Sequence, residues 1–76
     1  MSNIEKIYNL TKEKKPVFLY DDFKEVVCKI YPIDSEIKTF VKFKGKDEYE
    51  IDSKAKLVLD IEYGGEFITE KEYNEF

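Results

Sequence analysis

Hydrophobic residues near the start of the chain are spaced three or four positions apart, as on one face of an α-helix. These residues are Ile4, Ile7 and Tyr8. Ser2 and Glu5 occupy the positions of a capping box, in which each side chain bonds the backbone amide of the other residue. Pro16 disfavours the helical conformation at Lys15. The pattern therefore predicts a short amphipathic helix over residues 3–13.

Farther along the chain, apolar and polar residues alternate, which is typical of β-strands. The predicted strands cover residues 17–20, 25–31, 37–44, 48–51 and 57–63. The last of them is predicted because Leu57, Leu59, Ile61 and Tyr63 occupy every second position. Pro32 is expected to end the second strand, since proline donates no hydrogen bond to a sheet.

Residues 45–47 predict a three-residue loop between the third and fourth strands. This loop would set Val41 opposite Ile51 and Phe43 opposite Tyr49. Apolar side chains would then meet on one face of the sheet, and lysines would meet glutamates on the other. A two-residue loop would mix the two faces, so the three-residue loop is favoured.

The C-terminal segment predicts a second helix. Gly64–Gly65 should end the last strand, and Thr69–Glu72 has the pattern of another capping box. The expected fold class is therefore α+β: an antiparallel β-meander of about five strands, flanked by short N- and C-terminal helices. Both helices would cover the concave face of the sheet, or the strands would form a small open barrel.

The length of 76 residues allows one domain, residues 1–76, with a thin core. The one cysteine fits a reducing compartment, and the first ten residues lack the apolar run of a signal peptide. The longest apolar run, residues 17–20, is far too short to span a membrane. We therefore expect a cytoplasmic protein.

Several kinds of chemistry are disfavoured. The chain has no histidine, the commonest general base and the usual partner of a nucleophilic serine or cysteine. Cys28 lies in an apolar strand and is expected to be a buried, inert thiol. The acidic residues of segment 47–52 do not match a calcium loop and are expected to form solvated salt bridges. We expect no enzyme, no catalytic residue, no cofactor and no metal.

Charge is unevenly distributed along the chain. Residues 1–46 hold ten lysines and seven acidic residues, a net charge of +3, whereas residues 47–76 hold three lysines and ten acidic residues, a net charge of −7. The acidic part interleaves carboxylates with aromatic rings, a combination suited to contact with another protein. The candidate partner-binding residues are Asp60, Glu62, Tyr63, Glu66, Phe67, Glu70 and Tyr73. The alternative is an ordinary solvated surface.

A second candidate surface suggests a different function. Lys38, Phe40, Lys42 and Lys44 fall on one strand, and lysines around an aromatic ring can bind single-stranded nucleic acid. Alternatively, these lysines pair with Glu48 and Glu50 while a terminal helix covers Phe40. A third hypothesis is a structural or oligomer-forming accessory protein, in which an exposed edge at residues 17–20 pairs between copies.

The overall style of the chain carries one resemblance. Lys, Glu, Ile, Tyr and Phe are abundant, Arg is absent, and the C-terminal part of the chain contains the segment Gly65–Tyr73 with its capping box. In these respects and in size it resembles small proteins of phages of low-GC bacteria. The resemblance implies a non-catalytic inhibitor or modulator that binds a host or defence enzyme, and it identifies no site residue.

Overall fold

The computed structural model describes residues 3–76, which form three helices and five strands. The helices are α1 (Asn3–Lys12), α2 (Lys56–Gly64) and α3 (Glu70–Glu75). The strands are β1 (Val17–Asp21), β2 (Val26–Ile33), β3 (Glu36–Phe43), β4 (Tyr49–Ile51) and β5 (Glu66–Phe67). All strand pairs are antiparallel. The α+β class and the sheet of five strands are confirmed.

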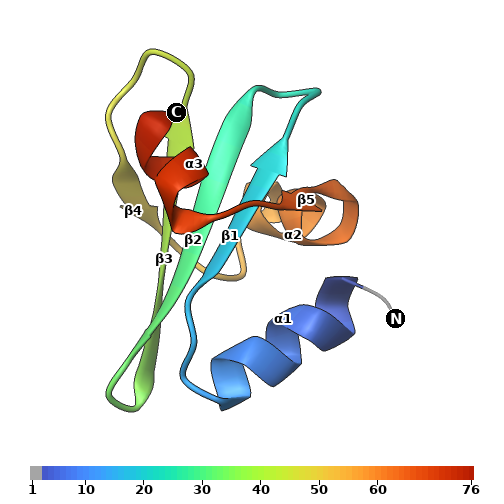
Figure 1. Cartoon of the computed structure of the whole chain (residues 1–76), viewed down its shortest axis with the longest axis vertical. Helices are drawn as coiled ribbons and strands as arrows, with labels where there is room; N and C mark the ends of the chain where they lie inside the picture. Colours follow the sequence, from blue (N-terminus) through green and yellow to red (C-terminus); the bar gives the residue numbers. More distant parts are fainter. Residues whose placement is uncertain (1–2) are drawn as a thin grey trace.

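The strands form one open sheet in the order β4-β3-β2-β1-β5 (Figure 1). Strands β1 to β4 follow one another as a meander, and β5 returns to pair with the outer side of β1. Pairing aligns Leu19 with Cys28 and Cys28 with Val41, so these side chains share one face. Leu19 also aligns with Phe67 of β5.

Helices cover both faces of this sheet. The main core lies under α1 and α2, where Ile7, Val58 and Ile61 pack with the Leu19 face of the strands. A smaller core lies on the opposite face, where Tyr73 of α3 packs against Phe18 and Val27. Figure 1 shows α3 in front of the strands.

The expectation that both terminal helices cover one concave face, or that the strands form a barrel, is therefore wrong. Strands β1 and β2 are apolar on both faces, since Phe18 and Val27 alternate with Leu19 and Cys28. Each face needs its own cover to leave water, so α1 and α3 lie on opposite faces.

The prediction of a strand over residues 57–63 is also wrong, because this segment forms α2. Its buried residues, Val58 and Ile61, lie three positions apart on one helical face. Leu59 and Tyr63, which the alternation placed on one strand face together with Ile61, are exposed, whereas Ile61 is buried. The fifth strand of the sheet is instead the two-residue β5.

The predicted pairing of β3 with β4 is displaced by two residues. Val41 lies opposite Tyr49 rather than Ile51, and Thr39 lies opposite Ile51. A displacement of two keeps every side chain on its predicted face, because successive side chains of a strand point to opposite faces.

The connection between β3 and β4 explains this displacement, because it spans residues 44–48 rather than 45–47. The backbone amide of Lys44 donates to the carbonyl oxygen of Glu25 at 3.1 Å, so Lys44 does not pair with β4. The carboxylate of Glu48 forms an ion pair with Lys29 of β2 at 3.1 Å.

The C-terminal helix α3 has the predicted capping box. The hydroxyl of Thr69 accepts a hydrogen bond from the Glu72 amide at 3.1 Å, and the Glu72 carboxylate accepts one from the Thr69 amide at 2.9 Å. Ser2, of the first predicted capping box, lies outside the described residues. Pro32 does not end β2, which continues to Ile33. Within residues 3–76, no helix is long and apolar enough to cross a membrane.

Candidate binding groove

A groove of about 370 Å³ lies between α1 and α2 on the larger-core face of the sheet. The start of α1 is joined to the end of α2, since the side-chain amide of Asn3 donates to the carbonyl oxygen of Gly65 at 2.8 Å. Ile30 and Thr39 contribute to the lining from the sheet. We call this feature the α1–α2 groove, and both helices supply its walls.

The walls of the groove expose large apolar side chains to solvent. Ile4 and Tyr8 come from α1, and Leu59 and Tyr63 come from α2. Tyr8 is 64% exposed and Tyr63 is 72% exposed. Ile37 of β3 adds a further exposed apolar residue. Contiguous exposed apolar residues of this kind mark contact surfaces more often than isolated ones do.

Glu62 is the one charged residue among the described residues that line the groove. The side chain is half-buried, and this burial raises the pKa of the Glu62 carboxyl above its ordinary value. No hydrogen bond or ion pair joins Glu62 to any residue of the described part of the chain. The groove therefore holds a carboxylate whose desolvation nothing within residues 3–76 offsets.

Thr39 places a second polar group beneath the groove. This residue is 1% exposed, and its hydroxyl has no hydrogen-bond partner within residues 3–76. The hydroxyl of Thr11, also in the lining, is satisfied because it donates toward the backbone carbonyl oxygens of Ile7 and Tyr8. A buried hydroxyl without a hydrogen-bond partner costs free energy, because it has lost its contacts with water and gained none within the protein.

The structure does not bring the seven predicted partner-binding residues onto one surface. Glu62 and Tyr63 lie in the α1–α2 groove. Asp60, on the same helix, forms an ion pair with Lys24 at 3.0 Å. Glu66 is exposed on the short strand β5.

The other predicted contact residues lie elsewhere. Phe67 is half-buried, and the Lys6 Nζ atom lies 4.2 Å from its ring centroid. Glu70 is exposed in the first turn of α3, on the opposite face of the sheet. Tyr73 is 1% exposed and belongs to the smaller core. Only the Glu62–Tyr63 pair therefore forms part of a concave site.

The lysine-rich strand β3 has its charges largely engaged within the protein. Lys38 pairs with Glu50 at 3.6 Å. The Nζ atom of Lys42 lies 4.8 Å from the ring centroid of Tyr73. Phe40 is half-buried, and only Lys44 of the predicted nucleic-acid surface is exposed. Pairing of this strand with glutamates, as the alternative reading expected, is observed for Lys38.

A small polar cluster lies beside these lysines. The hydroxyl of Tyr73 donates to the Glu48 carboxylate at 2.5 Å, and Lys29 pairs with the same carboxylate at 3.1 Å. Burial alone would raise the pKa of Glu48, but these two contacts and the charge of Lys42 hold it below its ordinary value. The Glu48 carboxylate is therefore held by contacts with Tyr73 and Lys29 of the same chain.

Two further expectations concern β1 and β2. Cys28 is completely buried, and this burial, together with the charge of Glu62, raises the pKa of its thiol to about 12. A thiol in that state is a poor nucleophile. The suggestion of an exposed edge at residues 17–20 is wrong, because β5 pairs with Leu19 and Tyr20 on that side.

Sequence reasoning missed most of the groove. Ile4 and Tyr8 were predicted to share the buried face of the first helix with Ile7, but only Ile7 is buried. Leu59 was assigned to a strand. The sequence did offer one signal. The apolar face of α1 carries Ile4 and Tyr8 as well as the buried Ile7, so it presents more apolar side chains than the helix buries.

The α1–α2 groove presents an apolar wall, two exposed phenol rings, the Glu62 carboxylate and three hydroxyls, those of Thr11, Thr39 and Ser53. Within residues 3–76, no three His, Cys, Asp or Glu side chains are grouped as metal ligands. No family model, curated protein or solved structure matches the chain.

Proposed function

We propose that this protein is a non-catalytic binding module that inhibits or modulates another protein, with the α1–α2 groove as its contact surface. The observation that carries this proposal is the exposed apolar wall of the groove, including Tyr8 and Tyr63. Tyrosine is enriched among the residues that dominate binding energy at interfaces, because its ring buries a large area with few rotatable bonds.

Charge supports a protein partner over nucleic acid. Affinity for nucleic acid depends on lysines and arginines that neutralise phosphates. Lys29 and Lys38 are paired with glutamates, and Lys42 lies against Tyr73. These cations would have to give up internal contacts before they could bind phosphate. An enzyme of the host or of a defence system is the proposed target, following the resemblance to small phage proteins.

The test is capture of a partner from a native-host lysate by the tagged full chain, with and without nuclease. The Tyr8→Ala/Tyr63→Ala double variant removes both exposed rings from the groove. We expect it to lose at least about tenfold of the captured protein, since truncating an interface tyrosine that dominates binding costs ~2 kcal/mol or more. Thermal melts would establish that the variant is folded.

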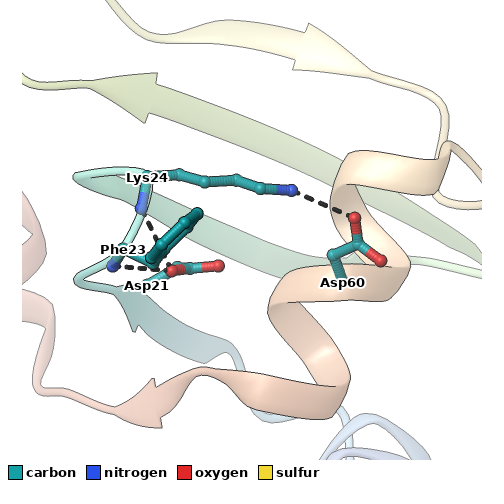
Figure 2. A network of polar contacts seen from close by, with 4 residues as sticks. All are labelled: Asp21, Phe23, Lys24 and Asp60. Atoms are coloured by element: carbon teal, nitrogen blue, oxygen red, sulfur yellow. Dashed lines mark hydrogen bonds and ion pairs between the residues drawn. The ribbon is translucent and has the colours of Figure 1, made fainter.

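Phe23 offers a matched control, because it is 90% exposed and does not line the groove. Figure 2 shows its turn, in which the Asp21 carboxylate accepts hydrogen bonds from the amides of Phe23 and Lys24 at 3.0 and 3.3 Å. Lys24 also reaches Asp60 of α2. None of these polar contacts uses the Phe23 ring, so Phe23→Ala should leave the turn intact.

The results of the capture experiment distinguish the groove from other contact surfaces and protein partners from nucleic acid. Loss of the partner with the double variant and retention with Phe23→Ala would support the groove as the contact surface. Equal capture by the double variant and the unmodified chain would overturn that assignment. Loss of every partner after nuclease treatment would favour nucleic acid instead.

A further inference from the structure

We infer that the α1–α2 groove accepts a lysine or arginine side chain of the partner protein, flanked there by aliphatic residues. This inference rests on the proposed function and specifies its partner chemistry. The cationic group would lie beside Glu62, and its aliphatic stem would lie between Tyr8 and Tyr63.

The first argument is charge complementarity. Glu62 is the only charged residue among the described lining residues, and it has no ion pair or hydrogen bond within residues 3–76. A cation from outside would regain the interaction that the half-buried carboxylate loses when it leaves bulk water. An anionic partner group at this position would add a second desolvated negative charge.

The second argument is the character of the walls. The rings of Tyr8 and Tyr63 are exposed, and Ile4 and Leu59 add aliphatic surface. Lysine and arginine carry long apolar stems that pack on such surfaces while the charged end finds a polar partner. Aromatic rings also attract cations placed over their faces.

The same protein already uses this combination on its other face. Lys29 pairs with Glu48 at 3.1 Å, and its Nζ atom lies 5.4 Å from the ring centroid of Tyr73 and 4.8 Å from that of Phe40. There, a cation, a carboxylate and aromatic rings are all supplied by one chain. In the α1–α2 groove the carboxylate and the rings are present, and the described chain supplies no cation to Glu62.

The test is selection of random displayed peptides on the immobilised full chain. Peptides that depend on the groove should lose binding with Tyr63→Ala and keep it with Phe23→Ala. Among them we expect enrichment of lysine or arginine with aliphatic neighbours. Glu62→Gln should weaken the best such peptide about tenfold, as expected for a charge-assisted contact shielded from water.

A double-mutant cycle isolates the contact. The selected peptide is remade with its basic residue replaced by methionine, which keeps an unbranched apolar side chain without the charge. If the cation contacts Glu62, Glu62→Gln should weaken the original peptide and leave the methionine peptide unchanged. Equal effects on both peptides would contradict the contact.

Other outcomes of the peptide selection distinguish failure of this inference from failure of the proposed function. Groove-dependent peptides without enriched basic residues would overturn this inference and leave the proposed function standing. Failure to obtain any groove-dependent peptide would count against both. Self-association of the chain in sedimentation, abolished by Tyr63→Ala, would show that a second copy occupies the groove and would also overturn the inference.

Discussion

Two glutamates on opposite faces of the sheet differ in what surrounds them. Burial raises the pKa of Glu62, which has no cation beside it in the described structure. Burial also acts on Glu48, but Tyr73 and Lys29 outweigh it and lower the pKa. The two carboxylates should therefore affect stability with opposite signs.

The same substitution at each position tests this difference. A carboxyl with a raised folded-state pKa disfavours folding as the pH rises above its unfolded-state pKa, and does so fully above the folded-state pKa, so Glu62→Gln should stabilise the protein near pH 7. Solvent access keeps the gain small, at about 0.5 kcal/mol, or roughly 2–4 °C in Tm. A lowered pKa contributes stability above the unfolded-state value, so Glu48→Gln should destabilise by about 0.5–1 kcal/mol.

Thermal melts of both variants over a range of pH would measure these effects. As the pH falls through the ordinary glutamate range, the gain from Glu62→Gln should vanish first. The loss from Glu48→Gln should persist to lower pH, until the native carboxylate of Glu48 is itself protonated. If both variants changed Tm in the same direction at neutral pH, the surroundings described for Glu48 and Glu62 would be contradicted.

Thr39 provides a second test at the residue scale. Valine has nearly the same shape as threonine but lacks the hydroxyl, which has no partner within residues 3–76. Thr39→Val should therefore stabilise the free protein by about 1 kcal/mol, because it removes an unsatisfied buried group. Denaturant unfolding would measure this. A loss of stability would mean that the hydroxyl has a partner in solution, such as a bound water.

At the scale of single elements, the end of α2 depends on one glycine. The amide of Gly65 donates to the carbonyl oxygen of Ile61 at 2.7 Å. A Cβ atom at Gly65 would lie 2.6 Å from that oxygen and 3.1 Å from the carbonyl oxygen of Tyr20 in β1. The close approach of α2 to the sheet therefore leaves no room for a side chain.

Gly64 makes a matched comparison, because a Cβ atom there would meet nothing within 4 Å. Gly65→Ala should destabilise the protein by about 1–3 kcal/mol, as overpacking does. Gly64→Ala should be neutral or stabilising by up to ~1 kcal/mol, since alanine loses less backbone freedom in a helix. Chemical denaturation of the two variants measures both effects, and similar values would contradict the packing of α2 against β1.

A helix or strand could be predicted from the sequence when the residues that determine it are close neighbours along the chain. The C-terminal helix was predictable because Thr69 and Glu72 form its capping box between neighbouring residues. In contrast, Ala55, which precedes α2, provides no side-chain cap, and α2 has no acidic residue in its first turn. Its short apolar run fits both a strand and a helix, so tertiary packing of Val58 and Ile61 decides between them.

At the scale of the whole molecule, the groove was beyond sequence reasoning. It exists because α1 and α2, which strands β1 to β4 separate in the sequence, lie on the same face of the sheet. The acidic C-terminal third, in turn, is divided between faces, with Glu62 on one side and Glu70 on the other. Clustering of charge along the sequence therefore did not predict clustering on the surface.

The pairing of β1 with β5 also bears on how this protein could change in evolution. It closes most of the chain into one loop, which contains the exposed connection around Gly45. Doubling the length of a flexible loop costs only about 0.6 kcal/mol. A segment inserted beside Gly45 would therefore hardly weaken the pairing of β1 with β5. Gly45 also lies outside both helices of the groove. The protein could thus gain or lose sequence there while the α1–α2 groove stays the same.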